Sequence, residues 1–232
     1  ENAPYYRMIR ERAEGGFASV CSGEITVNNE EASRSNGYTD VPDENGSFFP
    51  LAKKAAKMIK DNNAIAMMEL SHLGAIADRS ERCLHPWGPV HFTREDGVEV
   101  LAYQREMMDK TIKDYCDCAL YAKHAGFDGI LIHGGHGWQF AQFLSPLENT
   151  RTDEYGGSLE NRAKFPLMVV DRIRQRCGER FLIEYRMSGC EEIEGGLSQA
   201  DGIAFAKLLD GKVDLIHVSA GVHEDPSVFV LT

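Results

Sequence analysis

The chain has 232 residues, the length of one α/β domain, and its 43% hydrophobic content is enough for a sizeable core. Its 36 acidic side chains outnumber 25 basic ones, which gives a formal net charge of −11. This balance, without a Lys/Arg cluster, disfavours nucleic acid or an anionic membrane as the main partner. The longest apolar runs fall far short of the roughly 20 residues needed to span a bilayer.

The six cysteines show neither Cys-x-x-Cys spacing nor the density of a disulfide scaffold. They are Cys21, Cys83, Cys116, Cys118, Cys177 and Cys190. We expect free thiols in a reducing cytoplasm, no signal peptide being visible, and no metal or iron–sulfur site within this stretch.

Apolar runs and amphipathic segments alternate along the chain. Residues 5–14 predict a helix stopped by Gly15-Gly16, and residues 17–22 predict a strand that ends at Gly23-Glu24. The further helices are predicted over residues 51–60, 108–125, 159–176 (with Ser158 as the N-cap) and 200–209. The further strands are predicted over residues 64–70, 127–133, 181–187 and 213–219. Residues 28–47 and 71–97 are polar and predict two long loops.

Regular strand–helix alternation favours a parallel sheet. Five strands do not close an eight-stranded barrel, so the pattern allows either an open sheet or a piece of a longer barrel.

The stretch from Ile132 to Phe140 is the centre of the sequence. An apolar run leads into His133 and His136, separated by two glycines, so both imidazoles lie at or just past the carboxyl end of a strand. Catalytic groups collect there in parallel barrels. A packed structural histidine or a zinc ligand are the alternatives, although zinc usually needs three protein ligands and no third is visible.

Three motifs resemble the old yellow enzyme family of flavin-dependent ene-reductases. They are His133-Gly-Gly-His136-Gly, Gln142-Phe-Leu-Ser-Pro146 and the long run from Asn149 to Arg162, Asn-Thr-Arg-Thr-Asp-Glu-Tyr-Gly-Gly-Ser-Leu-Glu-Asn-Arg. The sequence of these motifs is most similar to the branch of 2,4-dienoyl-CoA reductases and related bacterial enoate reductases. Weaker similarity covers most of the chain.

The resemblance implies an FMN-binding (β/α)₈ TIM barrel, incomplete in residues 1–232, which we expect to form a single domain. The first strand and the last two βα units, which bind the FMN phosphate in the family, are not seen. The implied cofactors are FMN and NADH or NADPH as electron donor. Some family members carry 4Fe-4S and FAD in further domains, which would lie outside this chain.

By resemblance, His133 and His136 are the donor pair for a substrate carbonyl oxygen. The family usually places a Tyr two residues after the second donor, as the acid that protonates the α-carbon. Here that position is Trp138, whose indole N–H is a donor but no acid at neutral pH. Protonation from water or another group, a different substrate, or an impaired site are the alternatives.

Three further residues match flavin contacts of the family. Arg186 matches the arginine at the N1/O2 edge, where a cation stabilises the reduced ring. Glu69 stands where many members have Gln, and Glu24 where a small residue is common. The alternatives are a buried salt bridge for Arg186 and ordinary strand-end carboxylates for the two glutamates.

Other residues carry weaker expectations. His72 lines the pocket or is a solvated loop histidine, and the run from Arg151 to Arg162 is expected to be a structural ion-pair lattice. The aromatic residues Trp87, Trp138 and Phe140 form either a wall for a flat substrate or part of the core, and His217 and His223 have no assignment.

The leading hypothesis is an FMN-dependent reductase of the C=C bond of α,β-unsaturated carbonyl compounds. The alternatives are a flavin enzyme of the same family with amine oxidation or demethylation chemistry, and a flavin-free barrel remnant without turnover. A metal-dependent hydrolase is least favoured. We expect a small-molecule unsaturated carbonyl substrate, no nucleic acid or membrane partner, and leave a homo-oligomer open.

Overall fold

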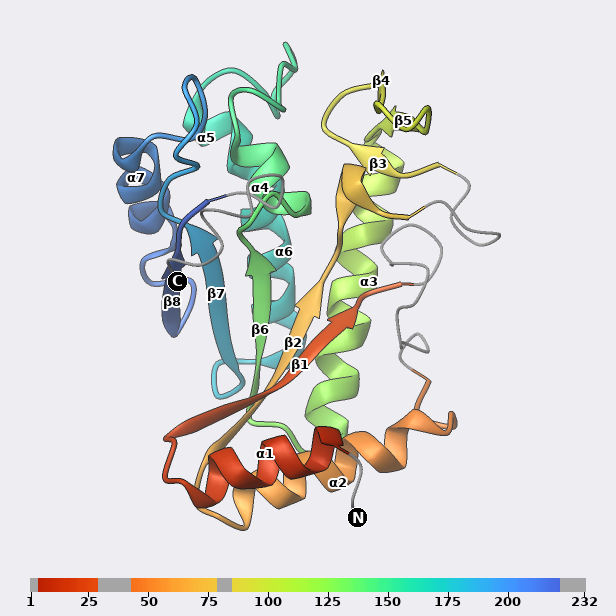
Figure 1. Ribbon diagram of the computed structural model, residues 1–232, viewed down its shortest axis with the longest axis vertical. Helices are drawn as coiled ribbons and strands as arrows, with labels where there is room; N and C mark the ends of the chain where they lie inside the picture. Colours follow the sequence, from red (N-terminus) through yellow and green to blue (C-terminus); the bar gives the residue numbers. More distant parts are fainter. Residues whose placement is uncertain (1–3, 29–42, 79–84, 222–232) are drawn as a thin grey trace.

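The computed structural model describes residues 4–28, 43–78 and 85–221 (Figure 1). Most of the loop predicted over residues 28–47, together with Cys83 and His223, lies outside the described residues. In the described part of the chain, no helix is both long and apolar enough to cross a membrane.

A five-stranded parallel sheet organises the molecule (Figure 1). Its strands are β1 (Ser19–Thr26), β2 (Ile65–Ser71), β6 (Gly129–Gly134), β7 (Leu182–Ser188) and β8 (Leu215–Ser219). They pair in the order β1-β2-β6-β7-β8, so each strand lies beside the next one of this sheet along the chain. Sequential parallel pairing is the arrangement that an arc of a (β/α) barrel has. All five predicted strands are confirmed.

Helices cover one face of this sheet and both ends of its strands (Figure 1). They are α1 (Pro4–Glu14), α2 (Phe48–Lys60), α3 (Arg105–His124), α4 (Gln139–Leu144), α5 (Leu159–Arg162), α6 (Lys164–Cys177) and α7 (Gln199–Leu209), with a short 3₁₀ turn η1 (Gly74–Ile76). The predicted helix over residues 159–176 is two helices, because Ala163 ends α5 and begins the turn into α6.

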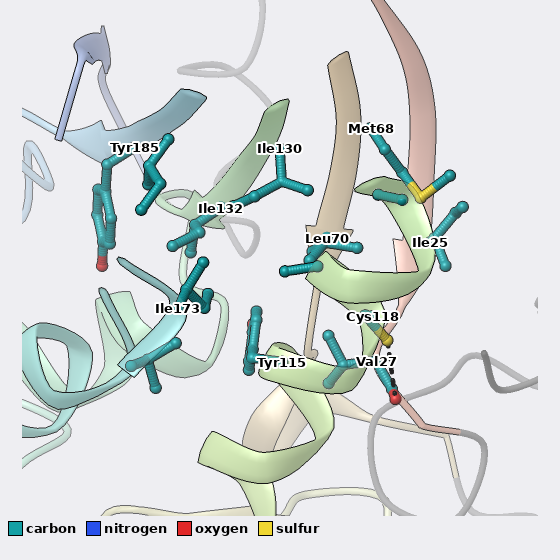
Figure 2. Packing of buried hydrophobic residues seen from close by; sticks show 14 of the residues in the cluster. Ile25, Val27, Met68, Leu70, Tyr115, Cys118, Ile130, Ile132, Ile173 and Tyr185 are labelled. Atoms are coloured by element: carbon teal, nitrogen blue, oxygen red, sulfur yellow. Dashed lines mark hydrogen bonds between the residues drawn. The ribbon is translucent and has the colours of Figure 1, made fainter. Parts of the chain in front are cut away.

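Alternate strand residues face the helices and form the main hydrophobic core. Figure 2 shows Leu70 and Ile132 of the sheet packed toward Tyr115 of α3 and Ile173 of α6. Successive side chains of a strand point to opposite faces, so the intervening residues lie on the other face. Met67 and Leu131, for example, are buried but belong to no part of this core.

Two details of the predicted strands and loops are wrong. β1 does not end at Gly23-Glu24 but continues to Thr26 through a β-bulge. Cys21 pairs with Met67 and Glu24 with Glu69, so β1 has one more residue than β2 between these pairs. Gly23 takes φ 86° at this bulge. The bulge places Glu24 inside the strand, in register with Glu69.

The polar segment predicted as a loop up to Gly97 contains two strands of a small sheet, whose third strand follows directly; the strand order is β3-β5-β4. Its strands are β3 (Trp87–Gly88), β4 (Phe92–Thr93) and β5 (Glu99–Ala102). β3 and β4 have two residues each and β5 has four, which is too short for a periodic signal in the sequence.

Candidate active site

The two motif histidines lie together at the carboxyl end of β6. His133 is the penultimate residue of that strand, and its Nε2 lies 2.9 Å from Nδ1 of His136. His136 has φ 58°, and its backbone N–H donates to Ser188 Oγ at 2.9 Å. Both side chains are buried, with 6% and 2% of their surface exposed. The chain thus holds the pair at a fixed hydrogen-bonding distance.

The two glycines between the histidines are required by close packing on β7. A Cβ on Gly134 would lie 2.3 Å from the Tyr185 hydroxyl, and one on Gly135 would lie 3.1 Å from the Ser188 backbone nitrogen. No side chain fits at Gly134 without moving its neighbours. The glycines therefore seat the histidine loop on the sheet.

Glu69 of β2 touches His133. Its Oε1 lies 2.8 Å from Nδ1 of His133, and 16% of its side chain is exposed. The two groups form an ion pair when His133 is protonated. Burial acts to raise the pKa of the Glu69 carboxyl, but His133, with Arg186 and His217, lowers it below its ordinary value. The carboxylate is therefore ionised at neutral pH.

Trp138 covers the flat face of His133. The two rings are stacked with their centroids 4.3 Å apart and an angle of 7° between planes. Trp138 is 4% exposed and stands at the N-cap position of α4. The residue at the position of the family's acid is thus a packing partner of a histidine in this chain.

Arg186 of β7 is the register partner of His133 on one side and of His217 on the other. Its Nε donates to Ser219 Oγ at 2.9 Å. Burial first, and then the positive charge of Arg186, lower the pKa of His136 to about 4. His136 is therefore neutral at physiological pH.

Glu24 lies at the margin of this group. It pairs in register with Glu69, and its Oε1 accepts from Ser71 Oγ at 3.1 Å. The side chain is exposed, unlike that of Glu69. The structure therefore brings Glu69, His133, His136 and Trp138 into direct contact, with Arg186 beside them in the sheet and Glu24 one strand further out.

Sequence reasoning missed a second pair on the same face. His217 of β8 has its Nδ1 3.2 Å from Oε1 of Glu184 of β7. Cys21 faces the same region, and burial together with Glu69 raises the pKa of its thiol to about 12, so the thiol is inert. The period of two in Glu184-x-Arg186 and His217-x-Ser219 is the signal that could have found these residues. Among the described residues, no group of three or more His, Cys, Asp or Glu is arranged to hold a metal ion.

His72 is neither a solvated loop residue nor part of this cluster. It is fully buried: its Nδ1 accepts from the Gly74 backbone at 3.0 Å, and its Nε2 lies 3.1 Å from the Tyr103 hydroxyl. Burial lowers the pKa of His72 to about 3. Of the two alternatives for the aromatic residues, the core holds for Phe140, which packs with Tyr115.

The motif from Arg151 to Arg162 makes the expected ion pairs and also bonds to backbone carbonyl oxygens. Arg151 pairs with Asp153, and Arg162 lies 3.7 Å from Asp201. Arg151 donates to the carbonyls of Pro89 and Tyr103 at 2.7 and 2.9 Å. Arg162 donates to Leu144 O at 2.7 Å, next to the end of α4. These guanidinium groups tie the loop to the small sheet and to the helix that follows the histidines.

A parallel α/β sheet with titratable side chains gathered at the carboxyl ends of its strands defines a class of α/β enzyme folds. Residues 2–224 match the NADH:flavin oxidoreductase / NADH oxidase family, and the chain belongs to this family. The resemblance read from the sequence is confirmed. Flavin is the cofactor of this family.

Individual relatives agree with this assignment. The chain is 36% identical over 179 residues to an NADPH dehydrogenase of Bacillus subtilis (strain 168), which covers 76% of this chain and 52% of that protein. It is similar to the structure of a 2-naphthoyl-CoA reductase complex (TM-score 0.86, 26% identity, 96% of this chain and 36% of that one). It is also similar to histamine dehydrogenase from Rhizobium sp. 4-9 (TM-score 0.85, 27% identity, 95% and 33%). The chain thus spans about half the length of the Bacillus relative and about a third of the length of each of the two solved chains.

Proposed function

We propose that this chain is the substrate-facing part of an FMN-dependent oxidoreductase that reduces the C=C bond of α,β-unsaturated carbonyl compounds, with electrons from NADH or NADPH. The observation that carries this proposal is the cluster of half-buried Glu69 with buried His133 and His136 near the strand ends. The NADPH dehydrogenase and 2-naphthoyl-CoA reductase likenesses support it.

The proposal includes a single barrel domain of which residues 1–232 form an incomplete arc. β1 and β8 are both edge strands of the sheet. On β8, Leu215 and Val218 are 54% and 63% exposed, although a strand inside a closed α/β barrel is covered on both faces. Further βα units beside β8 would bury these side chains.

The side chains on the open face of the sheet suit a flavin ring. Arg186 offers a cation for the N1/O2 edge, and Glu69 offers an acceptor for the ring N3–H. Glu24 is more exposed and contributes charge at the margin. When bound, FMN supplies two-electron transfer as a hydride. Arg186 would hold the ring edge on which negative charge collects after reduction.

The histidines would act on the substrate. Negative charge develops on the carbonyl oxygen when the β-carbon is reduced, and preorganised donors stabilise it. His136 is neutral and buried, so its one ring N–H can donate without the desolvation of a charge. Burial of both rings also excludes water, which strengthens each hydrogen bond.

The test uses the complete polypeptide that contains this chain. Its visible spectrum should show flavin bands that bleach with NADH or NADPH and return on addition of an enone. A colourless protein that takes up no added FMN would overturn the proposal and leave the flavin-free remnant. A matched test replaces His133 and His136 by Ala, which should abolish the long-wavelength absorbance that phenolic ligands produce with oxidised flavin.

A second candidate is amine oxidation or demethylation by the same family. The likeness to histamine dehydrogenase and the Trp138 substitution favour it. An amine that bleaches the flavin without NAD(P)H would establish this function, whereas bleaching by NAD(P)H and reoxidation by an enone would exclude it as the main activity.

A further inference from the structure

The two residues near the motif that depart from the family pattern, Glu69 and Trp138, both contact the side chain of His133. Glu69 stands where many members have Gln, and Trp138 where Tyr is usual. In this chain the Glu69 carboxylate lies 2.8 Å from Nδ1 of His133, and the Trp138 ring is stacked on the same imidazole. Both changes favour a positive charge on His133: one supplies a counter-charge, the other an aromatic face for a cation.

The protons of the two histidines can be counted from these contacts. Nε2 of His133 faces Nδ1 of His136 at 2.9 Å, so only one of these two nitrogens carries a proton. If His133 is neutral with its proton toward Glu69, its Nε2 accepts from His136, and Nε2 of His136 then has no proton to give. If His133 is protonated on both nitrogens, it donates to His136, and the proton of neutral His136 stands on Nε2.

The charges around the pair permit the second arrangement. Glu69 faces His133 from β2 and is ionised, since its contact with His133 helps to lower its pKa. Arg186 on β7 and His217 on β8 oppose a positive charge on His133. This opposition is reduced because Arg186 donates to Ser219 and the carboxylate of Glu184 lies 3.2 Å from His217. His136 stays neutral because burial and Arg186 lower its pKa to about 4.

We propose that Glu69, His133 and His136 form a proton relay that protonates the substrate enolate on its oxygen, the atom to which His136 donates. This inference rests on the proposed function, in which the flavin supplies two electrons and the hydrogen at the β-carbon. A lone pair of the enolate oxygen forms the O–H bond as the Nε2–H bond of His136 breaks. The resulting enol then takes a proton at the α-carbon from water and returns the O–H proton to water. The Nε2 proton of His133 passes to Nδ1 of His136. His133 ends neutral, with its remaining proton toward Glu69, and recovers one proton from solvent.

The first test reads the charge state directly and needs no activity. Nitrogen-15 NMR of the histidine rings at pH 7 should show one imidazolium, identified by its loss in His133→Gln. Glu69→Gln keeps the shape but removes the counter-charge, so the same ring should become neutral. Glu184→Gln, which removes a carboxylate beside His217 on the same face, is the matched control and should leave His133 charged. A neutral His133 in the parent protein would overturn the relay.

The second test uses the flavin-loaded complete enzyme. General acid catalysis is worth roughly 10²–10⁴-fold, so Glu69→Gln should slow enone reduction by the pre-reduced enzyme about 100-fold. The fall of this rate with rising pH should also begin at lower pH in Glu69→Gln than in Glu184→Gln. An unchanged pH profile in an enzyme that reduces enones would refute the relay alone. Failure to bind flavin or to reduce any enone would refute the proposed function, while the NMR result would still decide the charge of His133.

Discussion

Gly134 is the position where a single methyl group should disturb the site most. Its Cβ would lie 2.3 Å from the Tyr185 hydroxyl and 2.5 Å from two of its ring carbons. Tyr185 is fully buried against Phe205, so the ring has no room to withdraw. Normal carbon contacts are about 3.5–4.0 Å, so Gly134→Ala requires a shift of about 1 Å. Overpacking of this kind costs about 1–3 kcal/mol, which corresponds to about 2–12 °C in Tm for a chain of this size.

Thermal unfolding followed by circular dichroism would measure this loss, and two second-site changes make the test specific. Tyr185→Val removes the ring, so the double variant should be less destabilised than the sum of the single variants, by about 0.5–3 kcal/mol. Tyr185→Phe should give no such relief, because the clashing ring carbons remain. Its own effect should be small, since the Tyr185 hydroxyl is buried and has no hydrogen-bond partner among the described residues. An unchanged Tm in Gly134→Ala, or strict additivity with Tyr185→Val, would refute the packing argument.

Two further predictions concern buried polar groups. The pKa of His72 is about 3 in the folded chain against an ordinary value near 6.5, so the stability that its burial preserves is complete above pH 6.5 and is lost as the pH falls toward 3. His72→Gln should therefore flatten the fall of the free energy of unfolding between pH 6 and 4, measured by urea titration, by at most about 1.4 kcal/mol per pH unit. Equal slopes in the two proteins would contradict this. Ser145→Ala should cost about 1–3 kcal/mol in urea unfolding, because buried Glu191 loses a donor at 2.8 Å. A loss no larger than that of an exposed Ser→Ala change would argue against this anchor.

The large elements of the fold could be predicted from the sequence because their hydrophobic periods are regular. The five strands and the long helices all bury one face, and this leaves a pattern. α4 has no such hydrophobic pattern, because all six of its residues are buried and no polar face marks the helix. The bulge in β1 has no visible sequence pattern either, since a single extra residue at Gly23 shifts the register without changing the composition of the strand.

The members of the site could be predicted in part, but their contacts could not. Glu69 and His133 lie on different strands, and they meet only because β2 and β6 pair with Glu69 opposite Leu131. A one-residue slip in that register would turn one of the two side chains to the helix side. The stacking of Trp138 on His133 likewise depends on the left-handed turn at His136, which a sequence does not display.

The two departures at Glu69 and Trp138 therefore should not act independently. A buried carboxylate in place of an amide is costly unless a cation lies beside it, and an aromatic face stabilises a cation only if one is present. If His133 is that cation, Glu69→Gln removes its counter-charge and makes the ring neutral. The indole face of Trp138 then no longer stabilises a cation better than a tyrosine ring would. Glu69→Gln and Trp138→Tyr should then be non-additive in the free energy of unfolding at pH 7, by about 0.5–3 kcal/mol. The coupling should vanish in a His133→Gln background, and its persistence there would show that the two side chains communicate by a route other than the imidazole between them.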